Sequence, residues 1–235
     1  AVQSAGVAID GTNFPDANFR SHVASLFDED NDNYLSEEEI NEVKFINCVN
    51  EGISDLTGIS HFTALESFNC YNNQLTSLDV SKNTALAGLN CGYNQLTALD
   101  VSKNTALTWL GCAGNQLTAL DVSKNTALTD LDCDKNQLTS LDVSNTDMDE
   151  LDCDDNIYQI VVGNDRTFDL STLPGNFNVA KTSDWSGGTV SGNTLTVDSD
   201  QDSVTYKYDC GKDRRKTFTL KCVESADYTK VDAAI

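Results

Sequence analysis

One stretch of the chain, Asp28–Glu39, carries oxygen-bearing side chains at short and regular intervals. Carboxylate, hydroxyl and carbonyl oxygens are the ligands that hard cations such as Ca²⁺ prefer. The stretch therefore indicates metal-binding chemistry of that class. It is also compatible with a solvated acidic turn, in which Ser36 caps a short helix over Glu37–Val43.

The same twelve residues resemble the calcium-binding loop of the EF-hand family. The resemblance implies one calcium ion as cofactor, bound by the side chains of Asp28, Asp30 and Asp32, the backbone carbonyl of Tyr34, and the side chains of Ser36 and Glu39. Asn33 stands where the family has glycine. Because the loop needs a left-handed backbone there and Asn is the next most tolerant residue, we expect a reduced calcium affinity.

Two helices must position this loop. Apolar residues at helical spacing predict one over Phe14–Phe27, with Pro15 and Asp16 at its start. Its apolar positions are Phe19, Val23, Leu26 and Phe27. A lone EF-hand seldom acts as a sensor, so we expect calcium to be structural. It would hold this helix and the Glu37–Val43 helix over the open end of a repeat region.

Tandem repeats from Leu65 to Asn156 form the longest pattern in the chain. Their cysteines recur at intervals of 21 residues and finally 20, at Cys70, Cys91, Cys112, Cys133 and Cys153. A period in this range is typical of a solenoid, in which each unit buries its apolar side only by stacking on the next. Within one copy, Leu89 and Cys91 alternate with small or polar residues, which predicts a strand with one buried face.

The repeat frame, complete over Leu86–Ala106, is similar to that of the leucine-rich repeat family with cysteine in the third apolar slot. It is most similar to bacterial repeats of the internalin kind. The resemblance covers roughly residues 43–156. It implies an α/β-type repeat solenoid, a short right-handed coil with a parallel sheet on its concave face. A repeated asparagine should form a buried column that bonds backbone groups, at Asn73, Asn94, Asn115, Asn136 and Asn156.

We divide the chain into an N-terminal arm with a helical, EF-hand-like cap (1–43), the solenoid (44–156), a small β-rich C-terminal domain (157–224) and a tail or linker (225–235). In the third region five segments have the composition of strands, separated by Gly- and Pro-containing turns. They are Ile157–Val162, Phe168–Leu170, Thr194–Val197, Ser203–Tyr208 and Thr217–Val223.

The eight cysteines favour reduced thiols rather than disulfides or zinc. Those of the repeats should point inward from successive strands and behave as small apolar residues. No Cys-x-x-Cys pair exists, and His22 and His61 are the only histidines. Cys210 and Cys222 could pair, but a hairpin turning near residues 212–215 would set them out of register.

A graded surface is the candidate binding site. In the leucine-rich repeat family the side chains beside the inward residues line the concave face, so the resemblance implies an aromatic N-terminal half and an acidic C-terminal half here. The predicted partner-binding residues are Tyr71, Tyr93, Trp109, Asp130, Asp132, Asp134, Glu150, Asp152 and Asp154. Trp109 could instead merely cover Gly88 and Gly111. The acidic run could be a solubilising surface or a second cation site.

Composition limits the function. The net charge of -22 argues against nucleic acid and anionic membrane surfaces as partners, and no apolar run could span a bilayer. No catalytic constellation is present, so we expect no enzyme. We predict a monomeric, secreted or cell-surface bacterial protein that binds a protein partner, one with a basic surface being favoured. The alternatives are a spacer whose binding domains lie elsewhere and a glycan-binding adhesin.

Overall fold

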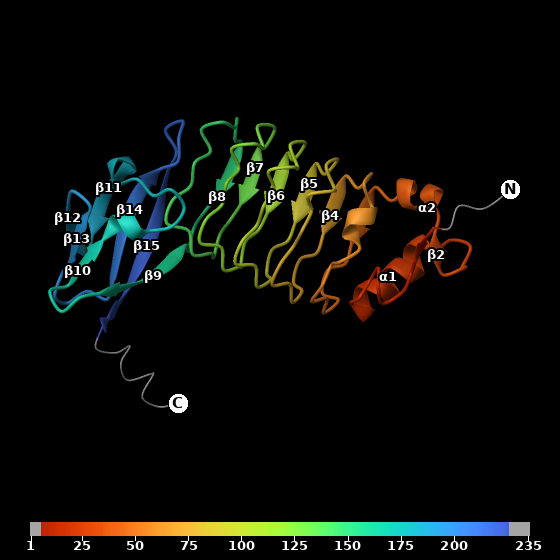
Figure 1. Cartoon of the computed structure of the whole chain (residues 1–235). Coiled ribbons are helices and arrows are strands. Elements are labelled where there is room, and N and C mark those ends of the chain that lie inside the picture. Colours follow the sequence, from red (N-terminus) through yellow and green to blue (C-terminus); the bar gives the residue numbers. More distant parts are fainter. Residues whose placement is uncertain (1–5, 226–235) are drawn as a thin grey trace, which may run out of the picture. The chain divides into compact units, whose positions relative to one another are not determined.

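The computed structural model describes residues 6–225, which form two compact units (Figure 1). The first comprises residues 6–116, 121–133 and 145–152, and the second comprises 117–120, 134–144 and 153–225. The first five residues of the predicted arm and residues 226–235 of the predicted tail lie outside the described residues. Within the described part, every helix is too short or too polar to cross a bilayer.

The first unit begins with helix α1, Ala17–Phe27. The prediction placed its start at Phe14, which is wrong by three residues. A residue that precedes proline is disfavoured in the helical region, and Asp16 caps the helix from an extended backbone. Leu26 is exposed rather than buried, although it lies on the same helical face as Phe19 and Val23; it belongs to the last turn of α1.

Asp16 also joins α1 to the first coil. Its Oδ1 accepts the N–H groups of Asn18 and Phe19, whereas its Oδ2 accepts the N–H of Ser54 at 2.9 Å and that of Asp55 at 3.3 Å. Partial burial raises the pKa of the Asp16 carboxyl, but these hydrogen bonds outweigh it, and the pKa falls below its usual 3.8. The ionised carboxylate therefore stabilises the folded state.

Asp16→Ala is expected to lower the free energy of unfolding by about 2 kcal/mol, because a helix cap and a tie between two elements are both lost. Asp16→Asn should lower the free energy of unfolding less, because the amide oxygen can still cap the helix. Since the folded pKa lies below the unfolded one, the charge-dependent part of the stability is present above pH 3.8 and is lost as the pH falls through the folded value. Urea unfolding at several pH values measures this. A wild-type advantage over Asp16→Asn that stays constant down to about pH 2 would contradict it.

Six short strands form the parallel sheet of the first unit, side by side in sequence order (Figure 1). They are β3 (Phe45–Asn47), β4 (Ser67–Asn69), β5 (Gly88–Asn90), β6 (Trp109–Gly111), β7 (Asp130–Asp132) and β8 (Glu150–Asp152). Each pairs in register with the next, and the central residue of every strand is buried. The predicted leucine-rich repeat solenoid is confirmed, and its first strand, β3, precedes the regular repeats.

A column of buried thiols follows the strands. Cys48, Cys70, Cys91, Cys112 and Cys133 are completely inaccessible, and all eight cysteines of the chain are unbridged. Burial raises the pKa of the Cys91 thiol to about 12. The thiols therefore stay protonated at neutral pH and act as core residues, as predicted.

The predicted asparagine column is present beside it. Asn94 Nδ2 donates to the carbonyl oxygens of Cys70 and Cys91, each at 3.1 Å, and its Oδ1 accepts the N–H of Leu75 at 3.0 Å. Asn115 repeats the pattern one coil later. These amides satisfy backbone groups that the tight turns leave unpaired.

The prediction missed a second buried column, Asn83, Asn104 and Asn125. Asn104 Nδ2 donates to the carbonyl oxygens of Val80 (3.0 Å) and Asn83 (2.9 Å), but its Oδ1 is buried without a hydrogen-bond partner. The other two share this arrangement. The repeat pattern contains all three residues, so the signal was the invariance of asparagine beside Thr84, Thr105 and Thr126.

The second unit contains seven strands in two sheets. They are β9 (Ile157–Val162), β10 (Thr167–Asp169), β11 (Thr182–Ser186), β12 (Gly188–Ser191), β13 (Thr194–Val197), β14 (Ser203–Asp209) and β15 (Arg215–Glu224). The orders are β11-β14-β15-β9 and β10-β13-β12. The prediction missed β11 and β12, whose Ser, Thr and Gly content hides the strand pattern.

The core of the second unit is aromatic. The Tyr206 ring stacks on Trp185 at a centroid distance of 4.5 Å, and its hydroxyl donates to the Thr139 carbonyl at 2.6 Å. Strands β14 and β15 form the anticipated hairpin. Cys210 lies beside its turn while Cys222 pairs with Ile160 on β9, so the two thiols are far out of register and unbridged, as the hairpin geometry predicted.

Candidate functional site

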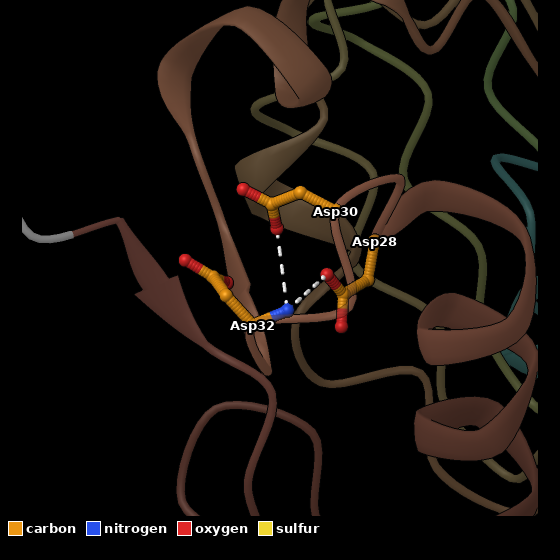
Figure 2. Close-up of side chains that lie close together, drawn as sticks. All are labelled: Asp28, Asp30 and Asp32. Carbon is orange, nitrogen blue, oxygen red and sulfur yellow. Dashed lines mark hydrogen bonds between the residues drawn. The ribbon is translucent and has the colours of Figure 1, made fainter.

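The acidic loop brings together three of its six predicted ligands. Asp28, Asp30 and Asp32 each offer a carboxylate oxygen within 4.8 Å of the others (Figure 2). Figure 2 shows the carboxylates of Asp28 and Asp30 pointing toward the backbone N–H of Asp32, which donates to them at 3.1 and 3.2 Å. Two oxygens bound to one Ca²⁺ at about 2.4 Å lie at most about 4.8 Å apart, so this separation fits the ion.

The backbone of the loop also meets the requirement of the motif. Asn33 has a φ of 67°, the left-handed conformation expected at the usual glycine position. Its N–H donates to Asp28 Oδ2, and the Tyr34 N–H donates to Asp32 Oδ1. Strand β2 (Tyr34–Leu35) pairs with β1 (Val7–Ala8), which holds this side of the loop in place.

Glu39 lies outside the group of three carboxylates. It is the third residue of helix α2 (Glu37–Glu42), and its Oε2 accepts the N–H and hydroxyl of Ser36 while its Oε1 accepts the N–H of Glu29. This capping box confirms that Ser36 caps α2. Partial desolvation opposes the ionised form, but the hydrogen bonds prevail and lower the pKa of Glu39. Each oxygen keeps acceptor capacity for a cation.

Repulsion within the loop is visible in Asp30. Desolvation raises its pKa, and the neighbouring carboxylates of Asp32, Glu39 and Asp28 raise it further, against one lowering hydrogen bond. Several negative charges are thus held together on a loop with two left-handed residues, Asn31 and Asn33. A bound cation would relieve that repulsion.

The concave face is the second candidate site. Here the term denotes the outer side chains of β3–β8, together with Tyr71 and Tyr93 that follow β4 and β5. The register places one such position of each strand in a single row, Phe45, Ser67, Gly88, Trp109, Asp130 and Glu150. A second row holds Asn47, Asn69, Asn90, Gly111, Asp132 and Asp152. The positions that vary between repeats therefore lie together.

The aromatic residues of this face lie on glycines. The Trp109 ring covers Gly111 so closely that a Cβ there would come within 2.7 Å of it, and Tyr93 covers Gly114 in the same way. The Tyr71 and Tyr93 rings contact each other at 5.2 Å. The alternative role of Trp109 was to cover Gly88 and Gly111. The ring covers Gly111, whereas a Cβ at Gly88 would contact only Ser67. Tyr93 and Trp109 still expose 40% and 38% of their surface, so the covering role leaves both accessible.

Sequence reasoning missed Phe45. It is 56% exposed and stands in the same row as Trp109. Beside it a groove is lined by four apolar residues, Leu26, Phe27, Val43 and Phe45, and four charged ones, Glu29, Glu39, Glu42 and Lys44. The available signal was the position of Phe45 before Ile46, which matches that of Trp109 before Leu110.

The acidic half divides between the two units. Asp130 lies opposite Glu150, and Asp132 lies opposite Asp152, in paired strands of the first unit. Like charges placed directly opposite each other destabilise a sheet. Asp134 and Asp154 belong to the second unit, where the N–H of Asp154 donates to Asp134 Oδ1 at 2.6 Å. A positively charged ligand would lower the cost of the pairs Asp130–Glu150 and Asp132–Asp152 in the first unit.

Comparisons with known proteins place this geometry in context. No protein-family model matches the chain. Two curated proteins named internalin J, from two strains of Listeria monocytogenes, are each 40% identical to it over 70 residues. That stretch is 30% of this chain and 8% of each relative, so the chain corresponds to a small part of either protein.

One solved structure gives a longer match. It is described as the functional domain of InlJ from Listeria monocytogenes, which includes a cysteine ladder. It superposes with a TM-score of 0.60 and 43% sequence identity over 67% of this chain and 35% of that one. This chain likewise carries a column of buried thiols along the strands of a parallel-sheet solenoid.

Proposed function

We propose that this chain, an internalin-like leucine-rich repeat protein, is an extracellular or cell-surface binding protein that presents its concave face to a protein partner. One observation carries the proposal. On a scaffold whose inward residues are nearly constant, the side chains that vary from coil to coil are gathered in two rows of one sheet. Exposed aromatics at one end and paired carboxylates at the other make that surface chemically distinctive.

The two halves suggest different contributions to binding. Trp109 and Tyr93 are rigid, partly exposed rings on small residues, which is the arrangement of interface residues that contribute most of the affinity. Asp130 and Glu150 would attract a basic surface and accelerate association, with a strong dependence on salt. A protein with an apolar or aromatic anchor beside a basic patch fits both halves.

The acidic loop supports a second part of the proposal, a structural calcium ion. The three converging carboxylates and the left-handed Asn33 support it, with Tyr34, Ser36 and Glu39 as the remaining ligands. Calcium there would stabilise the connection between α1 and α2. Such a role suits the calcium-rich environment outside cells.

An array of purified secreted and cell-surface proteins, probed with the labelled chain, tests the binding proposal. Trp109→Ala should weaken each genuine interaction by about 2 kcal/mol, or roughly 30-fold, and Tyr93→Ala should act in the same direction. Asp130→Asn should mainly slow association at low salt. Lys103→Ala, on an exposed turn away from the sheet, is the matched control and should bind like the wild type.

Partners that bind Trp109→Ala and Tyr93→Ala as tightly as the wild type would exclude the concave face as the site. A chain that captures nothing on the protein array, but binds a glycan array, would favour the adhesin alternative. Failure on both arrays would favour a spacer.

A further inference from the structure

The two most exposed large apolar side chains of the described residues line one groove of the first unit. Leu26, in the last turn of α1, is 60% exposed, and Phe45, the first residue of β3, is 56% exposed. Phe27 and Val43 complete the apolar lining. Single exposed apolar residues need no explanation, but a concave surface that gathers several of them is typical of a contact site.

The groove suits one bulky side chain. Its volume is about 360 Å³, which is within the range of sites that hold small organic groups. The Phe27 ring also contacts the buried Phe62 ring at a centroid distance of 5.5 Å, so this wall is anchored to the core of the first coil. An aromatic or aliphatic side chain placed there would remove apolar surface of both molecules from water.

The charged residues of the groove are mainly acidic. Glu29, Glu39 and Glu42 are accompanied by one cation, Lys44. Lys44 Nζ lies 3.9 Å from Glu66 Oε1, and Glu66 is not part of the groove. Within the described part of the chain no basic side chain pairs with Glu29 or Glu42, and both are exposed. The groove therefore complements a positive charge that lies next to an apolar side chain.

We propose that this groove binds an aromatic or aliphatic side chain of the protein partner that is flanked by lysine or arginine. This site depends on the proposed function and extends it, because Phe45 belongs both to the groove and to the row of Trp109. Phe45 and Trp109 are three strands apart, which is about 14 Å. A partner that contacts Trp109 can therefore reach the groove with the same surface.

Charge distinguishes this occupant from two others. Each copy of the chain carries a net charge of -22, so a second copy would be repelled. A purely apolar ligand would cover Leu26 and Phe45 but bring no positive charge to Glu29 and Glu42. A peptide with an apolar residue between two cations complements both parts of the lining.

Three synthetic peptides, blocked at both ends, test the groove without a known partner. Their sequences are Gly-Lys-Phe-Lys-Gly, Gly-Lys-Ala-Lys-Gly and Gly-Glu-Phe-Glu-Gly. Each is titrated into the isotope-labelled whole chain and followed by NMR. The Lys-Phe-Lys peptide should bind with a Kd on the order of 1 mM and shift the backbone signals of Phe27, Glu42 and Lys44. The other two should bind at least roughly tenfold more weakly.

Substitutions at exposed positions supply matched controls. Glu42→Lys should weaken binding of the Lys-Phe-Lys peptide about fivefold. Glu38→Lys, on the same helix but outside the groove, should change it less than about twofold, because salt screens the more distant charge. Leu26→Ser should weaken it about fivefold through the loss of apolar contact. Trp109→Ala should bind the peptide like the wild type. Circular dichroism verifies that each variant is folded.

Equal affinities for the Phe and Ala peptides would overturn the proposal, and so would equal effects of Glu42→Lys and Glu38→Lys. Peptide-induced shifts confined to Tyr93 and Trp109 would place the contact elsewhere and overturn it too. A partner from the protein array separates this site from the concave face as a whole. Loss of affinity with Trp109→Ala, but not with Leu26→Ser or Glu42→Lys, would keep the concave face and exclude the groove. The opposite pattern would support the groove and exclude the rows around Trp109.

Discussion

Asn94→Ala is expected to lower the free energy of unfolding by about 4 kcal/mol, one of the two largest effects predicted for this chain. The side chain is 7% exposed and serves several backbone groups at once. Its removal leaves the buried N–H of Leu75 without its acceptor, whereas the carbonyl oxygens of Cys70 and Cys91 each lose one of two amide donors and keep those of Asn73 and Asn115. A buried N–H without an acceptor costs about 1–3 kcal/mol by itself.

Two further asparagines are matched controls. Asn104→Ala should cost less than Asn94→Ala, because Asn104 bonds only carbonyl oxygens and leaves its own Oδ1 buried and unsatisfied. Asn90→Ala should cost least, since Asn90 is half-buried and accepts one bond from Gly92. Urea denaturation followed by circular dichroism measures all three. Equal losses for Asn94 and Asn104 would show that an orphaned amide oxygen has no energetic consequence here.

Calcium is expected to stabilise the chain by about 2.7 kcal/mol when its free concentration is 100 times the dissociation constant. The reason is linkage. The native loop gathers Asp28, Asp30 and Asp32 within reach of one ion, whereas the unfolded chain does not. Calorimetric unfolding in millimolar calcium against excess chelator measures the gain.

Asp28→Ala should abolish the stabilisation by calcium. In excess chelator it should change the free energy of unfolding little, because the loss of two hydrogen bonds is offset by reduced repulsion between carboxylates. Asp200→Ala, on an exposed loop of the second unit, should keep the full gain. Magnesium should stabilise less, since it tolerates only near-octahedral geometry. Identical unfolding with calcium and with chelator would remove the loop as a stabilising metal site. The loop would then contribute to stability only through the capping box of Ser36 and Glu39.

The solenoid was predictable from sequence in unusual detail. In a solenoid each coil contacts only the next, so every buried contact recurs at one sequence separation and appears as a period. That period identified the strands, the inward cysteines and the Asn94 column. The acidic loop was predictable for a related reason, because Asp28, Asp30 and Asp32 are brought together by local turns.

Features that depend on contacts between distant or non-repeating segments were decided only by the tertiary structure. Phe45 joins the row of Trp109 through the pairing of β3 with β4, and its coil lies outside the regular 21-residue repeats. Leu26 follows the same helical period as the buried Phe19 and Val23 yet is exposed, because the period does not determine how far along α1 the packing extends.

The second unit shows the same limit most clearly. Strand β9 pairs with β15, which lies more than fifty residues later, and no local pattern reveals that pairing. Local alternation determines that a segment is a strand. Which strand lies beside it depends on the packing of the whole unit around Tyr206, Trp185 and Phe218.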